Sequence, residues 1–202
     1  GTRSADSAGA ARLSKDDWQL VLVNKQHPVP EDYTFTLGKI KGSMKCDVRI
    51  IDDLMDMMQA AKADGIKLVV CSPYRDYNRQ TVLFNRKIDY YMEKGHSYME
   101  AYKFASMTVT VPGASEHQIG LALDIVCTIY AGLEIGFCET TAGKWLKEHC
   151  DEYGFILRYP QGKEYITGIQ YEPWHFRYVG KEAASQIMER GITLEEFLEE
   201  VE

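Results

Sequence analysis

Several stretches of the chain repeat apolar residues at the three-to-four-residue spacing of an amphipathic helix. One such pattern begins after Asp47 and ends at Gly65. Its apolar positions are Val48, Ile51, Met55 and Met58. We expect these side chains, methionines included, to pack in the core rather than to bind a metal or a cofactor. Similar patterns predict helices over residues 77–94, 97–106 and 141–153, and from 181 to the end.

Short apolar runs between these helices predict strands. They lie at residues 20–23, 66–71, 121–127, 155–158 and 174–179. Helices and strands come in mixed order, with hairpin-sized loops around Gly162 and Gly168, and not as regular βαβ units. The sequence therefore predicts an α+β domain with a small, mainly antiparallel sheet flanked by helices.

The chain begins with a small, polar stretch of low complexity. It predicts a flexible leader or linker over residues 1–17, followed by one domain over residues 18–202. No run approaches the roughly 20 apolar residues that a membrane-spanning helix needs, and no signal-peptide core is present.

Composition narrows the range of functions. Of the 202 residues, 45% are hydrophobic and 26% charged, as in ordinary globular proteins, and a domain of this size needs no metal merely to fold. The net charge of −7 argues against a nucleic-acid binder. Part of the acidity lies in a C-terminal run that we expect to be a solvated helix face, namely Glu195, Glu196, Glu199, Glu200 and Glu202.

The five cysteines form no C-x-x-C pair, which argues against a zinc ribbon and against a dithiol redox motif. Cys127 and Cys138 flank a short, turn-like stretch. They either form a disulfide in an exported protein or remain buried free thiols, and the sequence does not separate these alternatives.

The first stretch that carries chemistry runs from Ser115 to Asp124. His117 follows a Pro-Gly loop, Gly120 permits a tight bend, and Asp124 lies within an apolar strand. A carboxylate in mid-strand is costly to bury unless it is paired or coordinated. Asp124 is therefore either bonded to an arginine or to backbone amides, or it is a metal ligand.

The second stretch contains Glu172 and His175. In an ideal strand the two side chains would face opposite ways, but Pro173 cannot donate to a strand ladder and belongs at a strand's start. We expect the chain to turn there, so that both side chains reach one pocket. A lone histidine in such a strand is commonly a hydrogen-bonded core residue, and the neighbouring Glu172 favours the alternative, a metal ligand beside a base.

The third stretch places Arg75 directly after the strand at 66–71, with Gln80 about one helical turn later. An arginine there can clamp a carboxylate or an oxyanion with two hydrogen bonds, or it is a surface arginine paired with an acid. Taken together, the three stretches supply what zinc hydrolysis requires: three ligands, a base and a cationic partner. The remaining histidines have no partner carboxylates at useful spacing: His27, His96 and His149.

These motifs resemble the VanY-type D-alanyl-D-alanine carboxypeptidases, zinc peptidases of the M15 family. Their S-x-H-x-x-G-x-A-x-D pattern is met by Ser115, His117, Gly120, Ala122 and Asp124. Their E-x-W-H pattern is met by Glu172, Trp174 and His175, and their S-x-Y-R block by Ser72, Tyr74 and Arg75. The resemblance covers roughly residues 20–190.

The resemblance implies the small α+β fold of M15 peptidases and one catalytic Zn²⁺. Its ligands would be His117, Asp124 and His175. Glu172 would be the general base, and Arg75 would steady the oxyanion or the substrate's carboxylate. The substrate-binding residues would be Ser115, Gln80, Tyr74 and Trp174.

The implied reaction is removal of the terminal D-Ala from peptidoglycan stem peptides or their precursors. An L,D-carboxypeptidase acting on tetrapeptides shares these motifs, so they do not decide between the two. A zinc-bearing module that binds wall peptides without cutting them is a third alternative, and the presence of Glu172 argues against it. We expect a monomer that acts outside the cytoplasmic membrane, in the cell envelope. A membrane anchor would lie in an N-terminal segment that has been removed from this sequence. We expect neither nucleic acid nor a nucleotide cofactor as partner.

Overall fold

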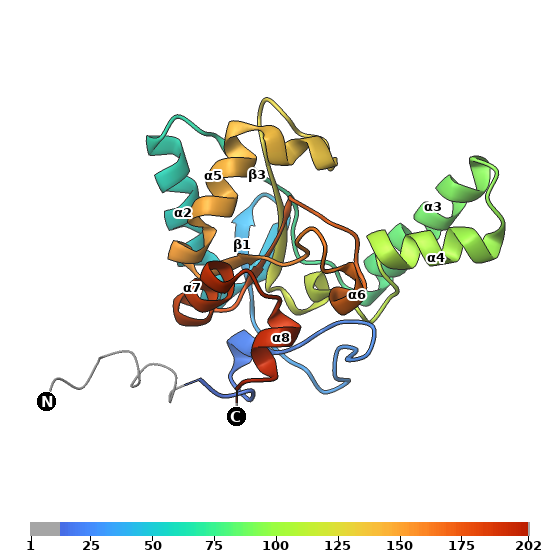
Figure 1. Ribbon diagram of the computed structural model, residues 1–202, viewed down its shortest axis with the longest axis horizontal. Coiled ribbons are helices and arrows are strands. Elements are labelled where there is room, and N and C mark those ends of the chain that lie inside the picture. The colour runs from blue at the N-terminus through green and yellow to red at the C-terminus, as the bar shows by residue number, and fades with distance from the viewer. Residues whose placement is uncertain (1–12, 202) are drawn as a thin grey trace, which may run out of the picture.

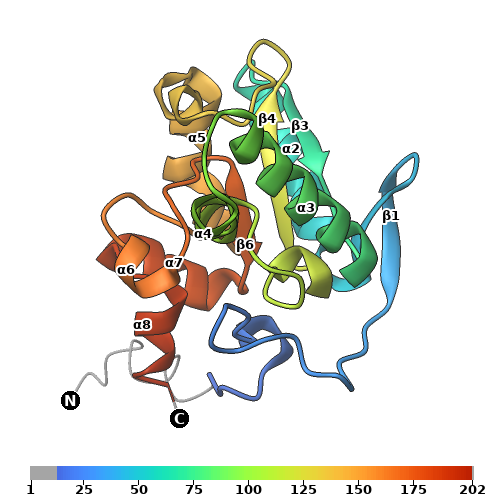
Figure 2. The same cartoon turned by 90° about the vertical axis from the view of Figure 1, so that its right-hand side faces the viewer.

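A four-stranded antiparallel sheet forms the centre of the molecule, which the computed structural model describes over residues 13–201 (Figure 1). The strand order is β3 (Leu68–Ser72), β4 (Ala122–Cys127), β6 (His175–Tyr178) and β5 (Phe155–Leu157), with β3 and β4 side by side in Figure 2. The α+β class and the antiparallel sheet predicted from the sequence are confirmed.

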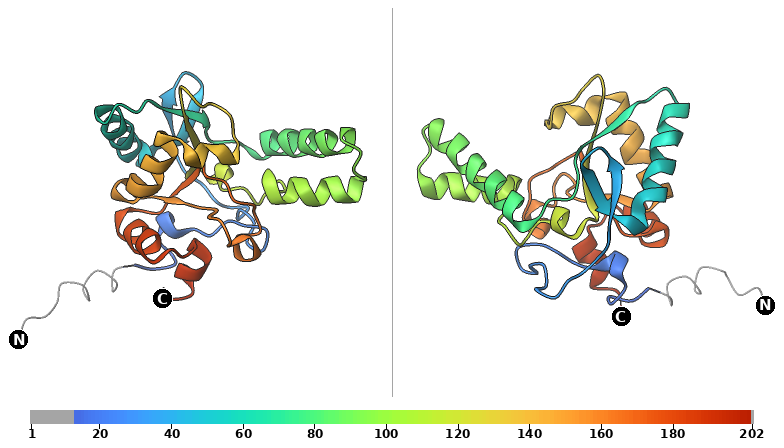
Figure 3. Two further views of the ribbon diagram at one scale, coloured as in Figure 1. Left: turned by 45° about the horizontal axis from the view of Figure 1, so that its top comes forward. Right: turned by 180° about the vertical axis from the view of Figure 1, so that it is seen from behind.

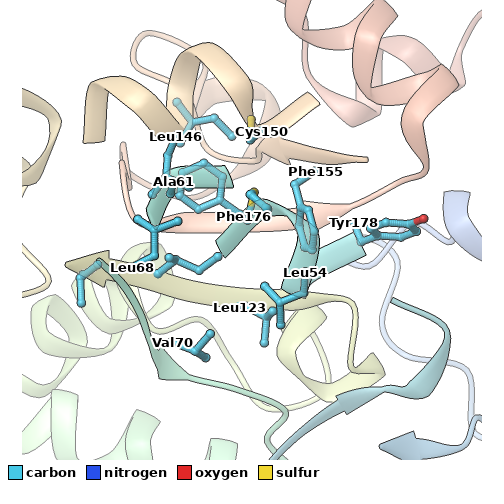
Figure 4. Close-up of a cluster of buried hydrophobic side chains, with 14 of the residues drawn as sticks. Leu54, Ala61, Leu68, Val70, Leu123, Leu146, Cys150, Phe155, Phe176 and Tyr178 are labelled. Atoms are coloured by element: carbon cyan, nitrogen blue, oxygen red, sulfur yellow. The ribbon is translucent and has the colours of Figure 1, made fainter. Parts of the chain in front are cut away.

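The main core lies between this sheet and the helices that cover one of its faces. These are α2 (Ile51–Ala63), α5 (Thr141–His149) and the 3-10 turn Cys150–Tyr153 that continues α5. Leu54 and Leu146 from the helices meet Leu123 and Phe176 from the strands (Figure 4). Because successive side chains of a strand face opposite ways, burial of Leu123 and Phe176 against the helices leaves their neighbours in β4 and β6 on the other face of the sheet.

A second apolar cluster joins β5 to the C-terminal helices α7 (Lys181–Arg190) and α8 (Leu194–Leu198). Leu13 packs against it, and Asp17 caps the 3-10 turn Trp18–Leu20. Residues 1–12 of the predicted leader lie outside the described residues, and the boundary at residue 17 stays a prediction.

Helices α3 (Tyr77–Glu93) and α4 (Tyr98–Thr108) form an antiparallel pair that projects from the body (Figure 1; Figure 3). Both were predicted from the sequence. Phe84 and Ile88 pack against Ala101 and Ala105 in a small cluster of their own. Ser97 begins α4 with a capping box, in which its side chain and that of Glu100 each accept a backbone N–H.

The hairpin of β1 (Leu37–Lys41) and β2 (Met44–Asp47) was not predicted. Its strands are short and rich in lysine, and most of their side chains are exposed or half-buried. Two backbone bonds tie it to the site region, from Asp47 N to Gly120 O and from Tyr74 N to Lys45 O.

Two predictions about local structure are wrong, one of them in part. Residues 20–23 form no strand: a 3-10 turn ends at Leu20, and the buried Arg177 donates to the backbone oxygens of Gln19 and Val21. The core positions predicted for the helix after Asp47 are half right: Ile51 and Met58 are partly buried against the main core, whereas Val48 is 46% and Met55 37% exposed. The fully buried positions of α2 are Leu54, Met57 and Ala61. The segment carries apolar residues at both phases, and the helix buries the face that contains Leu54.

The C-terminal acidic run is also not uniformly solvated. The Glu195 side chain is 12% exposed and accepts two bonds from the guanidinium of Arg158, at 2.7 and 2.8 Å. Arg158 is fully buried, and a buried cation requires a counter-charge. Glu199 and Glu200 are exposed, as predicted, and Glu202 lies outside the described residues.

All five cysteines lie in the described part of the chain and are free thiols, so the disulfide alternative for Cys127 and Cys138 is not realised in this structure. Over residues 13–201, none of the helices has the length and apolar character needed to cross a membrane.

Candidate active site

Three buried side chains converge on the face of the sheet opposite the main core. His117 comes from the 3-10 turn Glu116–Ile119, whereas Asp124 on β4 and His175 on β6 are direct cross-strand partners. Asp124 Oδ1 lies 3.2 Å from His117 Nε2 and 3.2 Å from His175 Nδ1. The three ligand atoms all lie within 4.8 Å of one another, close enough to share one metal ion.

The turn between His117 and β4 depends on Gly120. Its φ of 71° is left-handed, a conformation that glycine adopts without steric strain. A Cβ there would lie 2.7 Å from the Phe35 ring and 2.8 Å from Asp47 N. Gly120 thus lets the chain reverse from the His117 turn into the strand that carries Asp124.

The second nitrogen of each imidazole is fixed by a hydrogen bond. His117 Nδ1 donates to Pro73 O at 3.0 Å, and His175 Nε2 donates to Glu116 Oε1 at 3.0 Å. Each bond turns the other ring nitrogen toward Asp124 Oδ1. Such outer partners orient metal-binding histidines and select the tautomer that can ligate.

Glu116 is a residue of the site region that the sequence did not single out. It is fully buried and also accepts bonds from Arg158 Nε at 3.1 Å and Arg177 Nη1 at 2.9 Å. Burial raises the pKa of Glu116, but the two guanidinium charges outweigh it and hold this pKa well below its ordinary value. Its place beside His117 in the motif was the one available signal, because both arginines are distant in sequence.

Burial and neighbouring charges shift the pKa values of the three candidate metal ligands in different directions. Burial opposes ionisation of Asp124, but His117 and His175 hold the pKa of its carboxyl well below the ordinary value. Burial and the charge of Arg75 lower the pKa of His117 to about 4. For His175, hydrogen bonds to Asp124 and Glu116 outweigh burial and raise the pKa to about 9. A metal ion bound to His175 therefore displaces a proton.

These donors fit zinc. Two imidazole nitrogens and one carboxylate oxygen, all buried, are the ligand types that Zn²⁺ takes at catalytic sites, where a fourth position remains for water or substrate. No other group of three or more such side chains within residues 13–201 brings its ligand atoms together in this way.

Glu172 lies beside the triad, as predicted from Pro173. Its backbone N–H donates to Tyr159 O, and His175 N donates back to Glu172 O, which closes the turn. Glu172 Oε1 is 3.9 Å from His175 Nδ1. Burial raises the pKa of Glu172 to about 8, an effect that Asp124 increases and His175, Arg75 and Lys87 oppose.

Arg75 meets the triad through the second carboxylate oxygen of Asp124. Its Nη2 is 3.5 Å from Asp124 Oδ2, its Nε donates to Ser72 Oγ at 3.0 Å, and its Nη1 donates to Gln80 Oε1 at 2.9 Å. Gln80 is fully buried, and its Nε2 donates to the backbone oxygens of Val109 and Thr110. Gln80 therefore holds the Arg75 guanidinium and has no surface of its own to offer a substrate.

A cavity of about 520 Å³ opens onto these groups. Ser115 and Trp174 line it, together with the triad, Glu172 and Arg75. Tyr74 does not line it, and its ring instead meets Phe35 edge to face. The cavity wall also contains Tyr159, whose ring centroid lies 4.5 Å from that of His175 and which the sequence analysis did not single out.

Comparison with known proteins agrees with this geometry. The VanY family model, described as D-alanyl-D-alanine carboxypeptidase, matches residues 43–181. The chain belongs to this family. A D-alanyl-D-alanine carboxypeptidase of Enterococcus faecalis is 41% identical to this VanY-family chain over 184 residues, 91% of this chain and 67% of the relative.

Two solved structures show how closely the fold is shared. A vancomycin-resistance D,D-pentapeptidase, a VanY variant in complex with Zn(II), aligns with a TM-score of 0.83 and 41% identity, covering 90% of this chain and 99% of its own. The LD-carboxypeptidase LdcB aligns with a TM-score of 0.75 and 38% identity, covering 90% and 86%. The zinc of the first structure and the His–Asp–His set here identify the cofactor of this VanY-family chain as Zn²⁺.

Proposed function

We propose that this chain is a zinc-dependent carboxypeptidase that removes the terminal D-Ala from peptidoglycan stem peptides ending in D-Ala-D-Ala. The observation that carries the proposal is the position of Glu172 and Arg75 on the same cavity as the His117, Asp124 and His175 triad. A module that only binds peptides has no use for a carboxylate base beside the metal ligands. The E. faecalis relative and the family description both bear the name of this activity.

Each group of the site has its own role in the reaction. A zinc ion held by the triad would act as a Lewis acid and polarise the scissile carbonyl. Glu172 takes a proton from the attacking water and returns it to the leaving amine. Arg75, held by Ser72 and Gln80, offers its guanidinium to the charge that develops on the carbonyl oxygen or to the substrate's terminal carboxylate.

Substrate positioning falls to the remaining predicted residues. Ser115 and Trp174 line the cavity and would contact the D-amino-acid end directly. Gln80 would act through Arg75, and Tyr74 through the loop that precedes Arg75, because neither lines this cavity. The substrate lies outside the cytoplasmic membrane, so we propose that the chain acts there. We also propose that it acts as a monomer.

The likeness to LdcB supports a second candidate, an L,D-carboxypeptidase acting on tetrapeptides. The zinc-loaded protein should be incubated separately with a pentapeptide ending in D-Ala-D-Ala and with the matching tetrapeptide, and released D-Ala followed by mass spectrometry. We expect release from the pentapeptide. Release from the tetrapeptide alone would assign the second activity, and release from neither would contradict both.

A further inference from the structure

One face of α3 presents a row of basic and apolar side chains next to the active site. Arg79, Leu83, Arg86, Lys87 and Tyr90 lie at helical spacing and share one face. They line a second cavity, of about 740 Å³, which also includes Arg75 and Asp124. Lys87 lines the catalytic cavity as well, so the two cavities meet at this residue.

No carboxylate lies within ion-pair distance of the cations of this row in the part of the chain that the structure describes. Arg79, Arg86 and Lys87 take part in no ion pair there, and Lys87 lies 4.8 Å from the centroid of the Tyr90 ring. The single acid lining the cavity is Asp124, which belongs to the metal site. The row therefore places three cations on one helix face in a cavity whose lining contains a single acid.

The dimensions suit a peptide. At 1.5 Å per helical residue, the row from Arg79 to Tyr90 is about 16 Å long. An extended peptide covers about 3.3 Å per residue, so about five residues span the same length. The row begins four residues after Arg75, which directly precedes the α3 cap Asp76, and follows α3, which projects from the body together with α4 (Figure 3).

We propose that Arg79, Arg86 and Lys87 form a binding site for anionic groups of the substrate that lie upstream of the scissile bond. This inference rests on the proposed function and extends it from the terminal residues to the body of the substrate. Both carboxylates of a stem peptide and phosphates of its precursor carry the required chemistry, and guanidinium groups bind either with two hydrogen bonds. Leu83 and Tyr90 would contact the apolar parts between these charges.

Binding can be measured without turnover in zinc-loaded protein carrying Glu172→Gln. Three fluorescent peptides ending in D-Ala-D-Ala are compared by anisotropy: one with an upstream carboxylate, its carboxamide isostere, and the carboxamide peptide with a diphosphate ester at its amino end. We expect at least one anionic peptide to bind about tenfold more tightly than the neutral one, and added salt to reduce the difference. The anionic peptide that binds more tightly shows whether the site recognises a carboxylate of the stem peptide or a phosphate of its precursor.

The decisive comparison adds Arg79→Gln and Arg86→Gln to this background. We expect the preference for the anionic peptide to fall to nearly one, and Arg86→Lys to keep most of it. The matched control is Lys103→Gln, an exposed lysine on α4 outside the row, which should keep the full preference. Equal affinity for all three peptides, or a preference unchanged by the double substitution, would overturn the inference.

The proposed function is tested separately by D-Ala release from the wild-type enzyme. A preference for anionic peptides in the Glu172→Gln protein, with no release by wild type, would retain the anion site and reject the carboxypeptidase. Release of D-Ala by wild type, without any preference for anionic peptides, would retain the carboxypeptidase and reject the anion site.

Discussion

Glu116 Oε1 accepts a hydrogen bond from His175 Nε2 at 3.0 Å, and this contact decides which nitrogen of His175 faces the metal site. With Nε2 engaged, Nδ1 is the nitrogen that meets Asp124 Oδ1. Glu116 is itself held by Arg158 and Arg177, so the orientation of a metal ligand is tied to a buried ion network.

Replacing this carboxylate should loosen the metal without removing a ligand. For Glu116→Gln we expect a folded protein whose zinc affinity falls about 10- to 100-fold, the usual effect of changing an outer partner of a ligating histidine. Competition with a chromophoric chelator measures the affinity, and circular dichroism monitors the fold. Glu152→Gln is the matched control, because Glu152 contacts the surface residue His149 and should leave zinc binding unchanged. Equal affinities in the two variants would remove Glu116 from the metal site.

Glu172 should matter for turnover and not for metal retention. We expect Glu172→Gln to bind zinc as the wild type does and to lose about 100- to 10,000-fold in kcat, because the amide cannot take up the proton of the attacking water. The measurement combines metal analysis with D-Ala release, and Glu93→Gln, an exposed glutamate on α3, serves as control. Near-wild-type turnover in Glu172→Gln would show that another group is the base.

The grouping of His117, Asp124 and His175 was predictable because their motifs are local and few chemical roles need these residue types together. His117 and Asp124 are seven residues apart in sequence, and Pro173 correctly indicated the turn that brings Glu172 to His175. Roles that depend on contacts between residues distant in sequence were not predicted. Whether Gln80 touches substrate or holds Arg75 depends on how α3 packs, which no spacing reveals.

The same reasoning explains the errors in the fold. In α2, apolar side chains occupy two helical phases, and the choice between them is made by the sheet against which Leu54 packs. The solvated helix face predicted for the C-terminal acids failed at Glu195 because its partner, Arg158, is 37 residues away. The β1–β2 hairpin escaped detection because its exposed, lysine-rich strands carry little of the alternating apolar signal.

The Glu195–Arg158 pair should make stability depend on pH in the acidic range. Burial opposes the ionised form of Glu195, but Arg158 outweighs it and lowers the pKa of this carboxyl below its ordinary value of 4.5. A carboxyl with a depressed folded-state pKa stabilises the protein above the unfolded-state pKa. Its contribution is lost as the pH falls through the folded-state pKa.

For Glu195→Gln we therefore expect a free energy of unfolding about 3 kcal/mol lower at pH 7, because Arg158 loses part of its buried counter-charge. The difference from wild type should shrink as the pH falls below about 4.5. Urea titrations at several pH values measure it, with Glu199→Gln as the exposed control from the same acidic run. A difference that does not vary with pH would mean that the charge of Glu195 is not what stabilises the fold.

Gly120 should be irreplaceable for steric reasons that are independent of the metal. In Gly120→Ala, the left-handed φ of 71° alone costs about 1 kcal/mol. The added Cβ also falls 2.8 Å from Asp47 N, a backbone atom that donates to Gly120 O and cannot move without the β1–β2 hairpin. We expect a total loss on the order of 3 kcal/mol, which corresponds to a fall in Tm of roughly 6–12 °C for a domain of this size.

Gly42 separates the two contributions, because its φ of 58° is also left-handed but nothing lies within 4 Å of a Cβ placed there. Gly42→Ala should therefore lower the free energy of unfolding by only about 1 kcal/mol. Thermal unfolding of both variants in excess chelator excludes a contribution from zinc. If Gly120→Ala lost no more than Gly42→Ala, the close approach of Asp47 and Phe35 would not constrain this turn, and the spacing of His117 and Asp124 would have to be fixed by the metal instead.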